Sequence, residues 1–341
     1  MRLSACRGRL ADARSPVAPN DDGLLTGSRH AIRYLSSMAI ADERYARGPD
    51  EQVDKVAVIP FVLMHLAPLG ALWAGVRLRD VLVCIALYVV RMFFITAGYH
   101  RYFSHRAYKL GRGMQLVMAI GGTMAAQKGV LWWAGHHRHH HKHSDKPSDI
   151  HSPRRGLWWS HVGWILCRKY VETPFDAIRD FAKYPELRWL NEHYLVPPTV
   201  LAVACLLIGG PSMLFTGFFL STVLLYHGTF VINSLTHLFG SRRYRTTDTS
   251  RNSFLLALIT LGEGWHNNHH YYQSTANQGW FWWEIDISYY VLKVMSWVGL
   301  ARDLRLPPKA VMESNLLADG APDPGLLPPK DVEAVPAPAA E

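Results

Sequence analysis

Histidines gather in one short stretch of this sequence, between Trp133 and Asp145. Six of these thirteen residues are histidine. Among them, His137, His140 and His141 follow an H-x-x-H-H spacing, which places three imidazoles on one face of a helix, one turn apart. Imidazole nitrogen is a ligand suited to iron, zinc, copper or nickel. A solvated histidine-rich tract that binds metal loosely would have the same composition, so this stretch alone leaves both interpretations open.

The same spacing returns about 130 residues later, at His266, His269 and His270. Two unrelated tracts rarely share H-x-x-H-H by chance, and a tract that binds metal loosely requires no such spacing. The repetition therefore favours a built metal site over a loose one.

Two weaker pairs of polar residues lie where apolar segments end. His100 and His105 are separated by about 140° on a regular helix, so both reach one centre only if the helix unwinds or bends. Asn233 and His237 follow each other at the i, i+4 spacing and face the same way on a helix. For this second pair alone, ordinary capping of a helix end is the simpler explanation.

Together these groups exceed what one metal ion needs. Zinc takes four ligands, or three and a water, whereas nine imidazoles suit two metal ions with space for a small molecule. A redox metal held beside the lipid phase indicates chemistry on an acyl chain, because dioxygen reduced there can attack an unactivated C–H bond. The candidate groups are His100, His105, His137, His140, His141, His237, His266, His269 and His270, with Asn233 as a possible tenth.

Apolar residues are concentrated in runs long enough to meet a bilayer. Charged residues make up 18% of the chain, below the roughly 25% of soluble domains, and apolar residues make up 49%. A membrane helix takes about 20 apolar residues to cross the hydrocarbon core. We predict an all-α integral membrane protein whose transmembrane helices form two hairpins, over residues 56–75 and 81–99, then 194–208 and 213–236.

The remaining segments divide into two tails and a cap. Residues 1–55 are polar and Arg-rich, and residues 306–341 are rich in Pro and Ala, so both tails are predicted to be disordered. The membrane domain takes residues 56–305, including a helical cap made of 100–193 and 238–305. Much of the basic charge lies in the cap, which places the cap in the cytoplasm, and the N-terminal tail is predicted on the same side.

The formal net charge of +9 raises the question of a nucleic-acid partner. No nucleic-acid-binding motif occurs, and the apolar runs argue against such a partner. A basic cytoplasmic face beside anionic lipid explains the charge better. The first residues lack the apolar core of a secretory signal, and Met38 is an alternative start that the sequence leaves open.

The chain resembles the membrane fatty-acid desaturases of the stearoyl-CoA type, and most of all their bacterial and cyanobacterial Δ9 branch. The resemblance covers roughly residues 55–307, and the three histidine boxes occur in the family's order. It is carried by His-Arg-Tyr-Phe-Ser-His-Arg (100–106), His-Arg-His-His-His-Lys-His-Ser-Asp (137–145), Ser-His-Val-Gly-Trp-Ile-Leu (160–166), Asn-Ser-Leu-Thr-His (233–237), Gly-Glu-Gly-Trp-His-Asn-Asn-His-His (262–270) and Trp-Trp-Glu-Ile-Asp (282–286).

The resemblance implies four membrane helices and a cytosolic cap that holds a non-haem di-iron site. Its ligands would be the nine histidines above, with Asn233 holding a water near one metal. Such an enzyme uses O2, two electrons and two protons to form a cis double bond, here at the Δ9 position. The saturated acyl substrate is an acyl-CoA or a membrane acyl-lipid, held in a bent apolar tunnel that acts by positioning. No His-Pro-Gly-Gly haem loop occurs, so we expect an external electron donor (ferredoxin, cytochrome b5 or a reductase).

Several other residues receive narrower predictions. Asp145 and Glu263 are candidates to orient ligand imidazoles through hydrogen bonds. The histidines predicted not to bind metal, but to be exposed, packed or hydrogen-bonded, are His65, His136, His139, His143, His161 and His227. The basic residues predicted to face anionic lipid, with a CoA phosphate as the alternative, are Lys128, Arg154, Arg155, Arg168 and Lys169.

Two other functions compete with acyl desaturation. An acyl hydroxylase could use the same di-iron scaffold, and only the geometry of the bound chain separates the two outcomes. A metal transporter with a histidine-rich loop would need polar or acidic residues within its spans, whereas Arg91 is the one formal charge in a span core. Transport also leaves the repeated H-x-x-H-H spacing unexplained.

Overall fold

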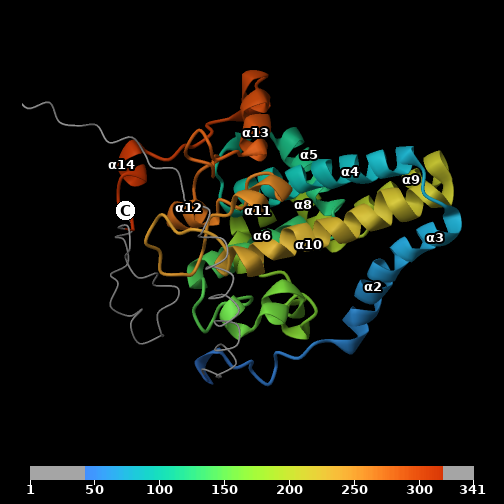
Figure 1. The fold of residues 1–341 in the computed structure, drawn as a ribbon, viewed down its shortest axis with the longest axis horizontal. Coiled ribbons are helices and arrows are strands. Elements are labelled where there is room, and N and C mark those ends of the chain that lie inside the picture. Colours follow the sequence, from blue (N-terminus) through green and yellow to red (C-terminus); the bar gives the residue numbers. More distant parts are fainter. Residues whose placement is uncertain (1–42, 318–341) are drawn as a thin grey trace, which may run out of the picture.

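The protein is largely helical in its structure, a computed structural model that describes residues 43–317 (Figure 1). Within these residues, three helical stretches are long and apolar enough to cross a membrane: Lys55–Ala74, Leu78–Ser104 and Val196–His237. The first comprises α2 (Lys55–Leu66), η2 (Ala67–Gly70) and α3 (Ala71–Ala74), and the second comprises α4 (Leu78–Phe93) and the π-helix η3 (Phe94–Ser104). The third comprises α9 (Val196–Ser212), the π-helix η8 (Met213–Leu220), α10 (Ser221–Ser234) and η9 (Leu235–His237).

The third stretch consists of two arms rather than one straight helix. At Gly210 the backbone adopts φ 72° and ψ −168°, a conformation that is easy only for glycine, and Pro211 starts the second arm. α9 then packs against η8, and α4 packs against η8 and α10. The break falls between the predicted spans 194–208 and 213–236.

The outward faces of these helices carry apolar side chains that suit lipid. Leu72 and Trp73 of α3 are 86% and 79% exposed, and Leu207 of α9 is 80% exposed. Arg91, the charge within a span, is buried instead and donates hydrogen bonds to Ser221 Oγ (2.5 Å) and Thr222 Oγ1 (2.7 Å). Its charge therefore ties α4 to α10 rather than meeting lipid.

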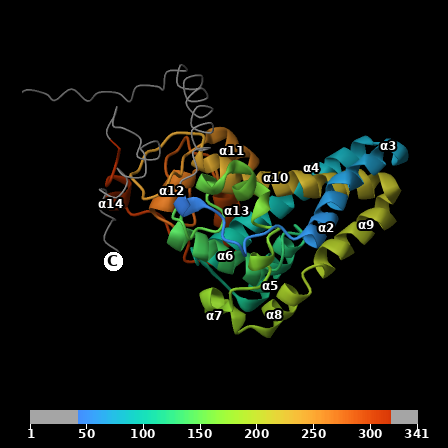
Figure 2. The ribbon, with the colours of Figure 1, turned by 90° about the horizontal axis from the view of Figure 1, so that it is seen from below.

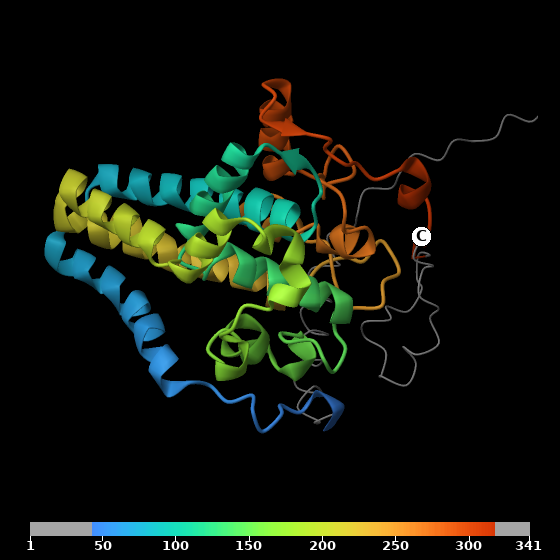
Figure 3. The same ribbon diagram turned by 180° about the vertical axis from the view of Figure 1, so that it is seen from behind.

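A helical cap lies at the end of the bundle away from α3 (Figures 1 and 3). Its first part holds α5 (Arg112–Thr123), α6 (Val130–His143), η4 (Pro153–Arg155), the π-helix η5 (Trp159–Gly163), η6 (Arg168–Tyr170), η7 (Phe175–Ile178), α7 (Arg179–Ala182) and α8 (Pro185–Glu192). Its second part holds α11 (Phe254–Ile259), α12 (His266–Tyr271), α13 (Ile287–Trp297) and α14 (Lys309–Met312). The strands β1 (Lys109–Leu110) and β2 (Ala301–Arg302) pair antiparallel and join the two parts.

Ordered chain extends beyond both predicted domain boundaries. In the predicted N-terminal tail, η1 (Glu43–Tyr45) forms a 3-10 helix, Glu51 is buried against Arg155 and Tyr170, and Val53 pairs with Cys167. In the predicted C-terminal tail, α14 is helical and Leu316 pairs with Tyr244. Short polar segments gain this order from contacts with the cap, which composition does not reveal. The remaining predicted tail residues, 1–42 and 318–341, lie outside the described part.

The main apolar core lies where η3 meets the cap helices. Tyr99 and Phe103 of η3, Met118 of α5 and Leu131 of α6 are fully buried there. α5 approaches η3 closely because its contact residues are glycines: a Cβ on Gly122 would lie 2.3 Å from the Tyr99 ring. Figure 2 shows α5 and α6 side by side at this end of the bundle.

Adding one methyl group at Gly122 therefore tests the contact between α5 and η3. We expect Gly122→Ala to lower stability by about 1–3 kcal/mol through overpacking against Tyr99. The matched control is Gly113→Ala on the exposed side of α5, where a Cβ meets nothing within 4 Å. That variant should stabilise the helix by up to about 1 kcal/mol. Thermal unfolding of both in lipid nanodiscs provides the measurement, and equal melting temperatures would contradict the close contact.

Candidate metal centre

The π-helix η3 brings His100 and His105 to the same side of the chain, although they would lie about 140° apart on a regular α-helix. A π-helix closes its turns with i→i+5 hydrogen bonds, so residues five apart lie nearly above each other. His105 N–H donates to the His100 carbonyl at 3.2 Å, and the two ring centroids lie 4.8 Å apart. The helix thus changes its winding where the sequence required it to unwind or bend.

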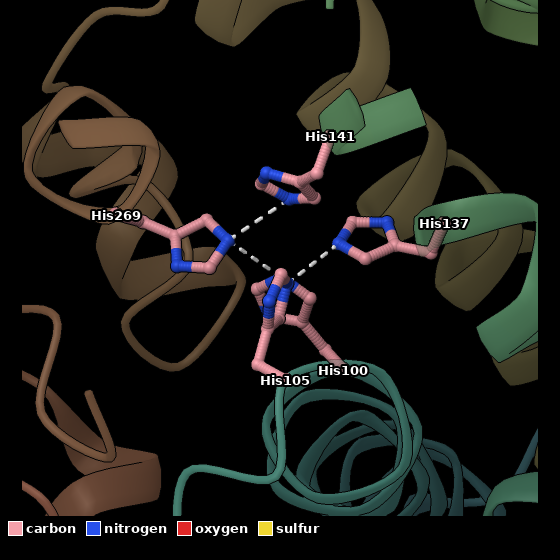
Figure 4. Close-up of side chains that lie close together, drawn as sticks. All are labelled: His100, His105, His137, His141 and His269. Carbon is pink, nitrogen blue, oxygen red and sulfur yellow. Dashed lines mark hydrogen bonds between the residues drawn. The ribbon is translucent and has the colours of Figure 1, made fainter. Parts of the chain in front are cut away.

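Five imidazoles form a first cluster, and Figure 4 shows them turned toward one centre. His100 comes from η3 and His105 caps its C-terminal end, His137 and His141 come from α6, and His269 comes from α12. One nitrogen from each lies within 4.8 Å of the others. The Nε2–Nε2 distances are 3.0 Å for His100–His269, 3.1 Å for His105–His137 and 3.1 Å for His141–His269.

A second cluster lies directly beside the first. His140, His237 and His270 form a group whose ligand atoms are also within 4.8 Å of one another. His266 joins it, with its Nε2 3.2 Å from His237 Nε2. The His270 and His141 ring centroids are 4.4 Å apart, so the two clusters share a boundary. All nine histidines singled out in the sequence meet here.

The geometry of these nitrogens fits metal ions. Two nitrogens bound to one metal at about 2.1 Å lie about 3.0 Å apart at a right angle and about 3.4 Å apart at a tetrahedral angle. The observed 3.0–3.2 Å matches this range. His269 Nε2 faces the Nε2 atoms of both His100 and His141, and one ring proton cannot satisfy both contacts. A cation between the rings would satisfy them all.

Four carboxylates fix which ring nitrogen points inward. Each accepts a hydrogen bond from the Nδ1 of one histidine, which leaves the Nε2 lone pair free to face the cluster. The pairs are Glu263 with His100 (2.6 Å), Asp149 with His140 (2.9 Å), Asp145 with His237 (3.1 Å) and Asp248 with His270 (2.7 Å). The hydrogen bonds predicted for Asp145 and Glu263 are therefore present, whereas sequence reasoning missed Asp149 and Asp248.

These carboxylates are ionised in spite of their burial. Burial alone would raise the pKa of Glu263, but the nearby His100 and Arg101 outweigh it and lower the pKa to about 2. For Asp145 the His237 contact likewise outweighs burial and holds the pKa below its usual range. Negative charge beside each paired imidazole strengthens that ring as a metal ligand.

Glu263 is itself held in place by a buried ion network. Arg101 is fully buried and donates to Glu263 at 3.0 Å and to Asp286 at 2.8 Å. Gln278 Nε2 donates to Glu263, and the Gln278 backbone N–H donates to Asp286, both at 2.8 Å. The sequence shows Arg101 only as the residue after His100, so nothing in the pattern reveals this network.

His151 is a further residue that spacing did not reveal. It forms a third group of possible ligands with His140 and Asp149, and its ring stacks on that of His140 at 4.1 Å between centroids. It also lines the main cavity, together with His137 and Trp164. The motif that carries it, Asp-Ile-His (149–151), shares no spacing with the histidine boxes.

The six histidines that the sequence predicts not to bind metal lie outside both clusters. His136 is buried rather than exposed, and its Nδ1 donates to the Trp132 carbonyl at 2.9 Å. His65, His227 and His161 form a hydrogen-bonded row, with 3.2 Å between His65 and His227 and 3.0 Å between His227 and His161. His139 bonds the Ser148 carbonyl and His143 packs on the His139 ring.

A mostly apolar cavity of about 340 Å³ leads to the histidine clusters. Its walls come from α2, α6 and α10 and from the segments 126–128, 164–166 and 194–195. His137 and Asn233 both line it, so the cavity places Asn233 on the same wall as one of the clustered histidines. Gln127 and Thr229 bond each other on its wall at 2.9 Å.

A known family has this combination of apolar helices and buried histidine clusters. The family model described as fatty acid desaturase matches residues 80–292, which hold all nine clustered histidines. This chain belongs to the fatty acid desaturase family. The resemblance read from the histidine boxes is thereby confirmed, and the desaturase is an integral membrane protein by its three apolar helical stretches.

Named relatives of this desaturase come from cyanobacteria and plants. The sn-1 stearoyl-lipid 9-desaturase of Synechocystis sp. is 38% identical over 228 residues, 65% of this chain and 70% of the relative. The enzyme of the same name from Anabaena variabilis is 34% identical over 267 residues, 76% of this chain and 96% of the relative. Delta-9 acyl-lipid desaturase 1 of Arabidopsis thaliana is 33% identical over 264 residues, 75% and 85% of the two chains.

Removing the charge of one orienting carboxylate should weaken metal binding. We expect Asp149→Asn to lower the affinity for ferrous iron about 10–100-fold, because His140 loses the anion that fixes its ring. Competition against a ferrous chelator measures this affinity. Asp176→Asn, a change at a 90% exposed side chain paired with Arg179, is the control. Equal iron retention in both variants would contradict the orienting role of Asp149.

Proposed function

We propose that this desaturase introduces a cis double bond at the Δ9 position of a saturated acyl chain esterified in membrane lipid. The observation that carries the proposal is the apolar cavity that ends at His137 and Asn233, beside two clusters of buried imidazoles. The names of the relatives support both the acyl-lipid substrate and the position, since they include stearoyl-lipid 9-desaturases.

Two iron ions are the proposed cofactors, held by the nine clustered histidines, with Asn233 binding one through a water. When bound, the iron pair supplies the activation of O2 needed to remove hydrogen from an unactivated methylene. The balanced reaction takes –CH2–CH2–, O2, two electrons and two protons to –CH=CH– and two waters. An external carrier (ferredoxin, cytochrome b5 or a reductase) supplies the electrons.

The protein's own contribution to this reaction is mainly positioning. The cavity wall, built from side chains such as Phe61, Met64 and Phe230, holds an acyl chain in van der Waals contact and excludes water. Trp133 stacks on the His137 ring, with 4.9 Å between centroids, and lines the same cavity. The methylene that rests against this ring pair is the one placed nearest the metal site.

The proposed topology has four membrane crossings, with both termini and the metal site on the cytoplasmic side. Gly210 divides the third apolar stretch into two arms, which provides the third and fourth crossings. His100 and His237 stand at the cap ends of the second and fourth crossings, so all the metal ligands lie at or beyond one membrane face. The membrane domain then spans residues 56–305 with its cap.

The acyl-lipid substrate is also consistent with the position of α2. Four residues of α2 line the cavity (Ala57, Pro60, Phe61 and Met64), and yet no residue of this helix is fully buried. The cavity wall is therefore a helix whose other side faces the lipid phase. One relative is named acyl-CoA C20 Delta5-desaturase, so acyl-CoA is the alternative that the product analysis must include.

Filling the cavity from α2 should block substrate without disturbing the metal. We expect Met64→Trp to lower desaturation at least about tenfold, because binding and positioning of the chain are lost, while iron content stays unchanged. Leu63→Trp is the matched control, since Leu63 is 59% exposed and does not line the cavity. Assays with stearoyl-lipid vesicles measure the effect, and an equal loss in both variants would contradict the assignment of the cavity.

Expression in a host that lacks its own desaturase tests the function. We expect the wild-type protein to produce a cis Δ9 monoene in the membrane lipid, seen by gas chromatography–mass spectrometry after derivatisation of the double bond. His140→Ala should abolish the product, because one cluster loses a ligand. A hydroxylated acid would show that the scaffold acts as a hydroxylase. A monoene confined to the acyl-CoA pool would show that the substrate is acyl-CoA rather than membrane lipid.

A further inference from the structure

A second, polar pocket reaches the metal site from the surface opposite the membrane. It has a volume of about 80 Å³ and is lined by residues of α6, α12 and the segment 245–248. His141 and His270, one from each imidazole cluster, form part of its wall. Figure 1 places α12 at the end of the molecule farthest from α3, so this pocket opens toward the cytoplasm in the proposed topology.

The exposed charges around this pocket are positive. Lys142, Lys146 and Arg245 are exposed and line it, and within residues 43–317 none of them forms an ion pair. The one carboxylate in the lining, Asp248, is buried and already paired with His270 at 2.7 Å. Among the described residues, the rim therefore presents three cations without an ion-pair partner beside a pocket that reaches two clustered histidines.

We propose that this cationic pocket is the docking and electron-entry surface for an acidic one-electron carrier protein. The inference rests on the proposed function, which requires two electrons from outside the chain. Each docking would oxidise the carrier by one electron, which would pass beside His141 or His270 to the metal site held by these histidines, and two dockings would supply the two electrons that the reduction of O2 needs for one double bond. Opposite charges steer such partners together and raise their association rates about 10–1,000-fold.

The position and the charge of the pocket distinguish this partner from other possible ligands. In the proposed topology the pocket lies beyond the cap ends of the apolar stretches, on the side away from the membrane. Entry of ferrous ions is disfavoured by the same three positive charges. A soluble protein with an acidic face around its redox group matches both the charge and the location.

Binding to the iron-free protein tests the docking independently of catalysis. The probe is an oxidised, acidic [2Fe–2S] ferredoxin, titrated against the full chain in lipid nanodiscs at low and high salt. We expect the triple change Lys142→Glu, Lys146→Glu, Arg245→Glu to weaken binding at least about tenfold and to remove its salt dependence. The control changes net charge equally elsewhere on the cap (Lys183→Glu, Arg188→Glu, Arg302→Glu). Equal weakening by both triples, or by neither, would overturn the proposal.

Turnover with two reductants separates docking from the proposed function. With the iron-loaded pocket variant, desaturation driven by reduced ferredoxin should fall about tenfold or more, whereas photoreduced deazaflavin, a small reductant that needs no docking, should support the wild-type rate. An equal fall with both reductants would overturn the docking role. If the unaltered protein forms no product with either reductant, the proposed function fails, while the binding measurement still decides the docking.

Discussion

Ring nitrogens of buried histidines face one another at 3.0–3.2 Å inside this desaturase, and the rest of the structure depends on that contact. Neutral imidazoles in water would keep their lone pairs hydrated, and burial without partners costs free energy. The fold meets this cost by aiming the lone pairs at common points, where a cation satisfies several of them. Removing the cation would leave several buried acceptors without a donor.

The surrounding helices and carboxylates hold the clustered imidazoles in position. The π-helix η3 brings His100 and His105 to one side, and the tight contact of α5 with Tyr99 and Phe94 holds η3 in that winding. The carboxylates select the ring nitrogen that points inward, and the Arg101–Asp286 contact holds one of those carboxylates. The ion network therefore fixes a carboxylate, and the carboxylates fix the imidazole rings. In this way the protein presents neutral nitrogen ligands with a defined geometry.

Much of this site could be predicted from the sequence, because short-range spacing carries the information. The H-x-x-H-H motif puts three rings on one helix face wherever the helix lies, and its repetition indicated a shared centre. The four apolar runs were readable for the same reason, since hydropathy is a local property. The gap between the predicted spans 194–208 and 213–236 also contains Gly210, where the third stretch turns.

Contacts between distant segments could not be predicted. Asp248 meets His270 and Asp286 meets Arg101 only after folding, and no periodicity links either pair. The cavity could not be predicted either, because its wall combines α2 and α10, which are more than a hundred residues apart in the sequence. The order of residues 43–54 also arises from tertiary contacts, such as that of Glu51 with Arg155. These contacts can be recognised only in the folded structure, whereas the histidine boxes can be recognised in the sequence.

Anomalous X-ray scattering from crystals of the iron-loaded protein, collected on both sides of the iron absorption edge, tests the central claim most directly. The account predicts two iron peaks per chain, one among His100, His105, His137, His141 and His269 and the other among His140, His237, His266 and His270. A single peak, or peaks away from these imidazoles, would contradict the claim that the nine histidines form a two-metal centre.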